Sequence, residues 1–408
     1  MKILYLSSVA VFGGAERSLL SIMASVAAAR PDWKLSLIAG GEGPLIERAR
    51  AMGIAATSVP MPESLARIGD AGANGPAGTQ VGRFALAASI ARAAAPATFY
   101  ARALRREIDA VLPTVIHTNG FKMHLLGAWA AGDKTPLVWH VHDYVSSRPV
   151  MARLMRLEAR RCAAAVANSI SVADDLRAAC PGPFDITTVY NAVDLDQFKP
   201  DGAIAPLDQL AGLTPAPAGT IRVGLVATFA RWKGQEVFMR GLAALPAAPA
   251  VRGYIIGDAV YRTRGSQYSL AELRALAKQH GLGDRVGFTG FVTDVAAAMR
   301  ALDIVVHAST EPEPFGLSII EAMASGKPVI ASRAGGAAEI IEASGGALFH
   351  RPGDSVELKN RIVQLAGDPA LRRCLGRAGR SAAERLFAGP RLAQDLIPIY
   401  ERVAGART

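Results

Sequence analysis

The sequence predicts an α/β protein made of two doubly wound domains, each with a parallel sheet covered by helices. Three observations lead to this class. The chain has 408 residues, and domains usually contain about 100–200 residues, so two domains are expected. Short apolar runs of strand length alternate with helical patterns, as in parallel sheets whose connections are helices. The alternation restarts after a Pro-, Ala- and Gly-rich stretch at residues 200–219, which is the predicted linker.

The first half of the chain opens with a strand, a helix and a second strand. Apolar runs predict strands at Lys2–Ser8, Leu35–Ala39, Val115–His117, Leu137–Val141 and Ala164–Ala167. The pattern over Ala15–Ala29 predicts the first helix. Residues 61–79 are rich in Pro, Gly, Ala and Asn and predict a flexible loop, and an Ala/Arg-rich helical stretch follows from Gln80 to Leu112.

The second half repeats this architecture. Its predicted strands are Ile221–Thr228, Gly253–Ile256, Val286–Thr289, Ile304–His307 and Pro328–Ala331, with helices between them. A last helix, Arg391–Val403, follows the break at Gly389-Pro390. A ligand held between two doubly wound domains is the natural inference.

Composition limits the class of protein and its location. Hydrophobic residues make up 50% and charged residues 20% of the chain, which is typical of a folded globular protein. Mean hydropathy is +0.22, yet no apolar run approaches the ~18 residues of a spanning helix. The apolar start, Met1 to Leu6, runs into Gly13-Gly14 without a cleavage site, so it indicates a buried strand rather than a signal peptide. Three sparse cysteines suit a reducing cytosol.

The net charge of +10 implies an acidic partner, which could be a nucleotide phosphate, an anionic membrane or a nucleic acid. Aromatic residues are only 6% and do not interleave with basic clusters, so nucleic acid is disfavoured. Two clusters of arginines lie in the first half: Arg83, Arg92, Arg102, Arg105 and Arg106, and Arg148, Arg153, Arg156, Arg160 and Arg161. They form either a solvated surface or a basic surface that meets a membrane, and both readings stay open.

The strongest chemical signal is the segment Glu313-Pro314-Phe315-Gly316-Leu317-Ser318-Ile319-Ile320-Glu321. It follows a predicted strand and opens a helix. The free N–H groups of Gly316, Leu317 and Ser318 would point at an anion. Glu313 and Glu321 could each bind a hydroxyl-bearing group. The alternative is a helix start with ordinary first-turn acids.

Two further segments follow strands. In Thr228-Phe229-Ala230-Arg231-Trp232-Lys233-Gly234, the cations Arg231 and Lys233 suit a leaving diphosphate, unless they are routine surface residues. In Phe12-Gly13-Gly14-Ala15-Glu16, a glycine turn precedes the first helix, where phosphates commonly bind. Neither GxGxxG nor GxxxxGK[ST] is present, so a dinucleotide or Walker site is disfavoured.

Histidines and one acidic motif complete the candidates. His140 and His142 would face the same side of a strand end, either as a packed pair or as ligands, but no third metal ligand is evident. Asp194-Leu195-Asp196 spells DxD, a metal–diphosphate pattern, but it lies in a predicted loop where Asp usually forms turns. We therefore expect no metal site.

Taken together, these residues resemble the retaining GT-B glycosyltransferases of the glycosyl transferases group 1, family 4, class. The resemblance covers essentially the whole chain, and the E-x7-E pair Glu313 and Glu321 anchors it. The segments that carry it are Gly13-Gly14-Ala15-Glu16-Arg17, Val141-His142-Asp143, Ala167-Asn168-Ser169, Asn191-Ala192-Val193-Asp194, Trp232-Lys233-Gly234 and Gly290-Phe291-Val292.

The resemblance implies two Rossmann-like domains that face a central cleft. Residues 1–200 plus 390–408 would bind the acceptor, and residues 215–389 would bind a nucleotide-diphosphate sugar. It also implies roles for single residues. Glu321 would bind ribose hydroxyls, the backbone near Phe291 and Val292 the base edge, and Glu313 with the N–H groups of Phe315, Gly316 and Leu317 the sugar. Arg231 and Lys233 would stabilise the departing diphosphate without a metal, His142 would contact the transferred sugar, and Gly14 would face the phosphates.

The chain departs from the family pattern at two positions. Ala227-Thr228 stands where the family has Gly-Arg, and Arg231 is the candidate substitute; Asn191-Ala192 stands where the family has Asn-Gly. The implied function is a cytoplasmic hexosyltransferase with a glycan or lipid-linked acceptor. The alternatives are a nucleotide-sugar epimerase or phosphorylase on the same fold, and a non-catalytic sugar-nucleotide-binding protein.

Overall fold

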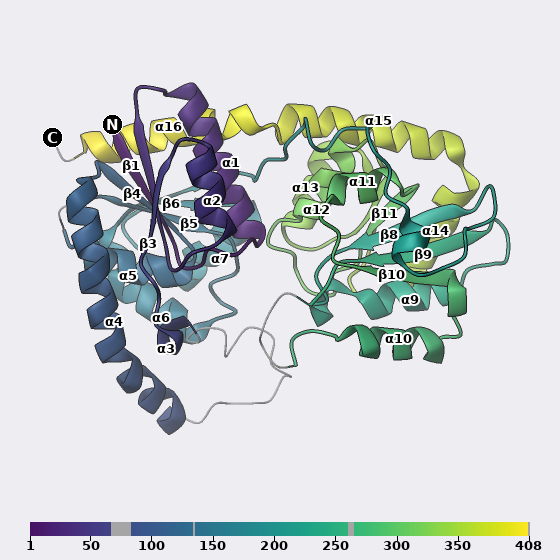
Figure 1. The fold of residues 1–408 in the computed structure, drawn as a ribbon, viewed down its shortest axis with the longest axis horizontal. Helices are drawn as coiled ribbons and strands as arrows, with labels where there is room; N and C mark the ends of the chain where they lie inside the picture. Colours follow the sequence, from purple (N-terminus) through teal and green to yellow (C-terminus); the bar gives the residue numbers. More distant parts are fainter. Residues whose placement is uncertain (67–82, 134, 260–264, 407–408) are drawn as a thin grey trace. The chain divides into compact units, whose positions relative to one another are not determined.

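A computed structural model describes residues 1–66, 83–133, 135–259 and 265–406, which fold into two compact units (Figure 1). Unit 1 contains Met1–Ala192 and Gly389–Thr408, and unit 2 contains Val193–Ala388. No helix among the described residues is both long and apolar enough to cross a membrane.

Unit 1 has a seven-stranded sheet in which every pairing is parallel and the order is β3-β2-β1-β4-β5-β6-β7. Its strands are β1 (Lys2–Ser7), β2 (Lys34–Ala39), β3 (Ala55–Ser58), β4 (Val115–Asn119), β5 (Leu137–Val141), β6 (Cys162–Ala167) and β7 (Asp185–Thr188). The strand order reverses between β1 and β4, which are neighbours. This reversal is the topological switch point of a doubly wound sheet.

Helices cover both faces of this sheet. They are α1 (Gly14–Ala29), α2 (Pro44–Ala51), α3 (Glu63–Ala66), α4 (Arg83–Val111), α5 (Phe121–Ala131), α6 (Pro149–Glu158), the 3₁₀ turn η1 (Ala159–Arg161), α7 (Ile170–Ala179) and α16 (Gly389–Gly405). Successive residues of β1 divide between two apolar cores. Leu4 packs with α4, α5, α6 and α7, while Tyr5 packs with α1, α2 and α16.

Unit 2 has a six-stranded parallel sheet with the order β10-β9-β8-β11-β12-β13. Its strands are β8 (Ile221–Val226), β9 (Val251–Ile256), β10 (Val286–Gly290), β11 (Ile304–His307), β12 (Val329–Ser332) and β13 (Ala347–His350). The order reverses between β8 and β11. The helices and 3₁₀ turns of this unit are α8 (Leu207–Leu210), η2 (Arg231–Lys233), α9 (Gln235–Ala243), α10 (Leu270–Gln279), η3 (Gly283–Arg285), α11 (Val295–Arg300), α12 (Leu317–Ala324), α13 (Gly336–Ser344), α14 (Ser355–Gly367) and α15 (Pro369–Leu386). Figure 1 shows α9 and α10 on one side of the sheet and α12 and α13 on the other.

The predicted two-domain α/β class is confirmed. Each predicted strand is present with its ends shifted by at most one or two residues, and the first and last helices extend slightly beyond their predicted bounds. The sequence missed β3, β7 and β13. All three lie at a sheet edge. The strands β3 and β7 carry polar, partly exposed residues and lack the continuous apolar run of a buried strand, whereas β13 is apolar over only three residues, Ala347–Phe349.

The predicted linker at residues 200–219 is wrong, because the segment lies within unit 2 and is anchored there by α8. Leu207 and Asp208 of α8 are buried, and the Asp208 carboxylate accepts hydrogen bonds from Arg222 and Arg252 at 3.1 and 2.7 Å. Unit 2 begins at Val193, whose N–H donates to the carbonyl of Phe387 at 2.8 Å. Ion pairs attach this segment to unit 2, so the pattern of apolar residues does not predict that it packs there.

The expected loop at residues 61–79 is partly described. Glu63–Ala66 forms the single turn α3, and residues 67–79 lie outside the described residues. The Ala/Arg-rich stretch forms α4 from Arg83 onward.

Candidate active site

The switch point of unit 2 carries two loops that bring Lys233 and Glu313 together. The first loop follows β8 and contains η2, and the second follows β11 and leads into α12. Because both strands are parallel neighbours, their carboxyl ends meet at one edge of the sheet. A reversal of strand order opens a crevice at this edge, where ligands of doubly wound sheets bind.

Backbone contacts hold the two loops against each other. The N–H of Thr310 donates to the carbonyl of Trp232 at 2.7 Å. Gly234 has φ +77°, and a Cβ at this position would overlap the carbonyl oxygen of Ala308. Only glycine combines this φ with so close an approach. The position of Lys233 is therefore set by the backbone on either side of it.

Glu313 is the centre of the site. Its Oε1 and Oε2 accept hydrogen bonds from Lys233 Nζ at 2.8 and 2.7 Å. Oε2 also accepts from Ser309 Oγ at 2.9 Å and from His307 Nε2 at 3.0 Å. Glu313 is only 7% exposed. Burial raises the pKa of its carboxyl, but the charge of Lys233 and the His307 contact outweigh burial and hold that pKa well below its ordinary value. Glu313 is therefore an ionised carboxylate.

The helix that follows Glu313 presents free backbone donors. Gly316 precedes α12 with φ +110°, and the N–H groups of Gly316, Leu317 and Ser318 have no acceptor among the residues the structure describes. The start of α13 fixes the chain before them, because the N–H of Gly336 donates to the Glu313 carbonyl at 2.7 Å. These donors and the helix dipole favour an anion here.

Glu321 lies in α12 and is 6% exposed. Because it comes four residues after Leu317, the two side chains lie on the same face of α12. Phe315 is buried and packs edge-to-face on Phe387, with ring centroids 6.0 Å apart. Phe291 and Val292 follow β10 on the far side of β9, and the Phe291 side chain is 72% exposed.

Arg231 points to different partners from Lys233. Its Nη2 contacts Glu272 Oε1 at 2.6 Å, and its guanidinium lies over the Tyr268 ring at 4.2 Å. Among the described residues its side chain contacts α10 and the segment just before it, and not Glu313. The role expected for Arg231 beside a diphosphate stays a prediction, and it requires these contacts to break.

In unit 1, Gly14 begins α1, as the glycine turn predicts. The carboxylate of Glu16 turns back, and its Oε2 accepts the N–H of Gly13 at 3.0 Å. Burial raises the pKa of Glu16. The Gly13 N–H at the start of α1 is therefore taken by the Glu16 carboxylate and is not free to bind a phosphate.

His142 follows β5 and is held by Asn119 at the end of β4. His142 Nε2 lies 2.6 Å from Asn119 Oδ1, so Nε2 carries the hydrogen. Burial lowers the pKa of His142 to about 3. The residue keeps some exposed surface, but its Nδ1 is enclosed and has no partner in the described chain.

His140 lies on the same side as His142, as expected, with ring centroids 3.9 Å apart. His140 is a packed core residue. Its Nδ1 is 3.2 Å from His117 Nε2, and His117 Nδ1 is 2.8 Å from the Tyr400 hydroxyl of α16. The sequence did not predict this buried chain, because its members lie far apart in sequence.

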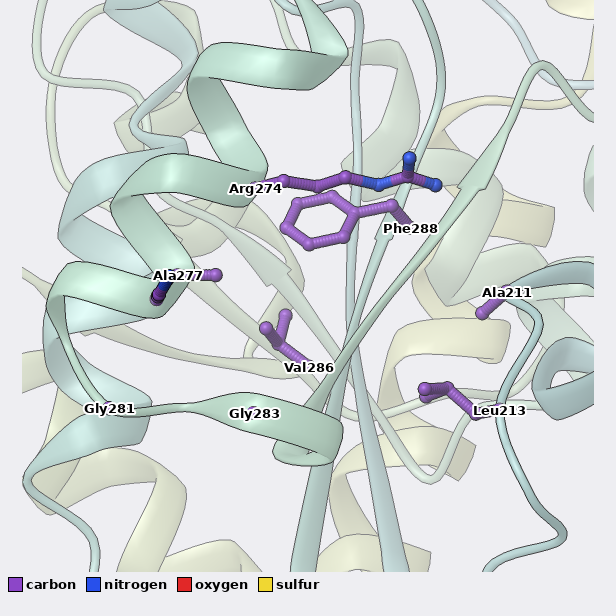
Figure 2. Close-up of a pocket in the computed structure, with 9 residues that line it drawn as sticks. Ala211, Leu213, Arg274, Ala277, Gly281, Gly283, Val286 and Phe288 are labelled. Atoms are coloured by element: carbon purple, nitrogen blue, oxygen red, sulfur yellow. The ribbon is translucent and has the colours of Figure 1, made fainter.

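Other features lie apart from Lys233 and Glu313. Asp194 of the DxD motif forms a turn, since its Oδ1 accepts the N–H groups of Asp196 and Gln197 at 2.9 and 3.0 Å. A groove of about 490 Å³ runs beside the edge strand β10 and shares no residue with the site. Figure 2 shows Arg274 extending toward Phe288 in this groove.

Comparisons with known proteins identify the family. The model for Glycosyltransferase Family 4 matches residues 12–197, and the model for Glycosyl transferases group 1 matches residues 214–382. The D-inositol 3-phosphate glycosyltransferase of Jonesia denitrificans is 30% identical over 319 residues, which are 71% of each chain. The chain belongs to the group 1 glycosyltransferases. The N-acetyl-alpha-D-glucosaminyl L-malate synthase of Bacillus anthracis is 25% identical over 70% of this glycosyltransferase and 74% of its own length.

Solved structures agree with this assignment. HepE of Anabaena in complex with UDP-glucose has a TM-score of 0.77 and 26% identity, covering 98% of this glycosyltransferase and 100% of that chain. The resemblance inferred from the sequence and the GT-B fold are thereby confirmed. The residues that the sequence missed at the site are His307 and Ser309. Their only signal was their place at and just beyond the end of a predicted strand.

Proposed function

We propose that this glycosyltransferase moves a hexosyl group, with retention, from a nucleotide-diphosphate sugar to a glycan or lipid-linked acceptor in cell-envelope or exopolysaccharide synthesis. The observation that carries the proposal is the Lys233–Glu313 pair beside the free N–H groups of α12. A cation and helix donors suit a diphosphate, and an ionised carboxylate suits sugar hydroxyls. HepE, which binds UDP and UDP-glucose, makes a uridine donor the first choice.

In the proposed reaction the bond between the sugar C1 and the diphosphate oxygen breaks. The nucleoside diphosphate leaves with the electron pair, and the acceptor hydroxyl attacks C1 from the same face and passes its proton to the departing diphosphate oxygen. Lys233 and the α12 donors meet charge that grows as the bond breaks, so they stabilise the transition state more than the bound donor. This role would need no metal.

The remaining residues take the roles that the family resemblance implies. Glu321 would bind the ribose hydroxyls, the backbone at Phe291 and Val292 the base edge, and Glu313 the hydroxyls of the sugar. We assign His142 to the transferred sugar and Gly14 to the phosphates on the same basis.

One observation favours a second candidate, a protein that binds a nucleotide sugar without transferring it. Thr228 stands where the family has Arg, and Arg231 is paired with Glu272. A panel of UDP- and GDP-sugars separates the candidates. A transferase releases nucleoside diphosphate slowly without acceptor, whereas a binding protein retains the sugar nucleotide intact. An epimerase would change the sugar, and a phosphorylase would need inorganic phosphate. Mass spectrometry of the co-purified donor would identify the substrate directly.

Peripheral contact with an anionic membrane is a further part of the proposal. On α6 and η1, the side chains of Arg153, Leu157 and Arg160 are exposed, and Leu157 is 77% exposed. Their i, i+4 and i+7 spacing puts them on one face. Each basic side chain near an anionic leaflet contributes about 1 kcal/mol.

Co-sedimentation with phosphatidylglycerol vesicles tests this contact. Binding should fall steeply with salt and weaken when Arg153 and Arg160 become Ser. A matched pair of exposed arginines of unit 2, Arg240 and Arg274, serves as the control. No binding at low salt would favour a soluble acceptor.

A further inference from the structure

His307 and Ser309 enclose one oxygen of Glu313 from the end of β11. Both are buried, at 5% and 0% exposure. Each contacts Glu313 Oε2, and His307 Nε2 and Ser309 Oγ are themselves 3.0 Å apart. The three side chains form a closed triangle built by residues at and beyond one strand end.

The hydrogens of this triangle follow from its charges. An ionised carboxylate only accepts, so both His307 Nε2 and the Ser309 hydroxyl donate to Glu313. His307 therefore carries a hydrogen on Nε2. Its Nδ1 is buried and has no partner among the described residues.

Lys233 reaches Glu313 in a different way. It comes from the β8 loop on a flexible stem, its side chain is 19% exposed, and its Nζ also lies 3.9 Å from the centre of the Trp232 ring. A bound diphosphate would compete with the Glu313 carboxylate for the positively charged ammonium group of Lys233. Lys233 contacts both carboxylate oxygens, whereas His307 and Ser309 contact only Oε2.

We propose that His307 and Ser309 are positioning residues that keep Glu313 in its sugar-binding orientation when Lys233 turns from the carboxylate to the diphosphate of the donor. They hold Oε2, so the plane of the carboxylate stays fixed and Oε1 is the oxygen that exchanges Lys233 for a sugar hydroxyl. This inference rests on the proposed function of the site.

The geometric part is tested without any donor. In protein labelled with ¹⁵N-histidine, the His307 signal is assigned by its loss in His307→Gln. The signal should be that of an Nε2–H tautomer in a hydrogen bond. It should persist in Lys233→Met and change in Glu313→Gln. A signal that changes in Lys233→Met as much as in Glu313→Gln would show that Lys233, not the strand end, holds the carboxylate.

The functional part compares His307→Asn with His307→Gln. The Gln amide nitrogen can reach the place of His Nε2, while the shorter Asn amide cannot. Loss of one hydrogen bond to a charged group corresponds to about a 10- to 100-fold effect. We expect turnover of UDP-glucose to fall by this factor in His307→Asn and in Ser309→Ala, and to recover in His307→Gln.

Affinity for UDP separates positioning from a structural role, because UDP carries no sugar. It should change less than about twofold in all three variants. Unchanged turnover in both His307→Asn and Ser309→Ala, or a loss of UDP affinity as large as the loss of turnover, would overturn the inference. If the unmodified protein does not bind UDP, the proposed donor is wrong, and the NMR comparison alone decides whether the strand end positions Glu313.

Discussion

Replacing Lys233 by Met tests the ion pair at the site. Met has a similar length and no charge, so the change leaves the Glu313 carboxylate without its cation. Breaking a buried ion pair costs about 3–5 kcal/mol. Here the Lys233 side chain is 19% exposed and His307 and Ser309 still contact Glu313, so we expect about 1–3 kcal/mol of unfolding free energy to be lost.

The same variant should lose more turnover than donor affinity. Removing one electrostatic group that acts on a developing anion lowers kcat by about 10²–10³-fold, whereas its loss from the bound donor should weaken affinity by about tenfold. Urea unfolding measures the loss of stability, and release of nucleoside diphosphate measures the loss of turnover.

The double variant Lys233→Met, Glu313→Gln is the control for stability. It removes both charges, so its loss of stability should be smaller than the sum of the two single losses. Additive losses would show that the pair contributes nothing to folding. Full turnover in Lys233→Met would refute the role of Lys233 in departure of the diphosphate.

Three further predictions follow from other parts of the molecule. Gly234→Ala should abolish turnover, because the added Cβ would push apart the two loops of the site. The control Gly281→Ala is also at positive φ but in open space, so it should lower the unfolding free energy by only about 1 kcal/mol. Turnover and melting temperature of the two variants test this difference. Asp208→Ala should destabilise unit 2 by about 3 kcal/mol, because two arginines lose a buried partner, and a urea midpoint equal to that of the unmodified protein would contradict it. Unit 1 should lose stability as pH falls from about 6.5 toward 3. Below about pH 6.5 the histidines bind protons in the unfolded chain but stay neutral when buried in the folded chain, so each lowers the unfolding free energy by up to about 1.4 kcal/mol per pH unit. Tryptophan fluorescence follows this loss, and equal stability at pH 7.5 and 5.5 would contradict it. The histidines of unit 1 whose pKa is lowered by burial are His117, His124, His140 and His142.

The sequence predicted the central strands and the edge strand β10, and it missed three other edge strands, two of which are largely polar. A central strand of a parallel sheet is buried on both faces and reads as an unbroken apolar run, as Leu137–Val141 does. An edge strand such as β7 keeps exposed residues and reads as a loop. The packing of residues 200–219 was hidden in the same way, since Asp208 is held by ion pairs with strand residues rather than by apolar contacts.

At the site, the sequence identified residues through local patterns and missed those that act through space. Lys233 and Glu313 lie in recognisable loop motifs, although no pattern shows that the two are in contact. His307 ends a strand and carries no motif, so its contact with Glu313 is visible only in the fold. Arg231 shows the opposite error. Its position two residues before Lys233 predicts that the two cations act together, but its guanidinium binds Glu272 instead.

The most direct test of the central claim is release of nucleoside diphosphate from a panel of UDP- and GDP-sugars by the full chain and by Lys233→Met. We predict that at least one sugar nucleotide, with UDP-glucose the first choice, is cleaved by the unmodified protein, and that Lys233→Met cleaves it at least about 100-fold more slowly. Tight binding of a sugar nucleotide without any cleavage or transfer, or equal cleavage by both proteins, would contradict the claim that the Lys233–Glu313 site performs glycosyl transfer.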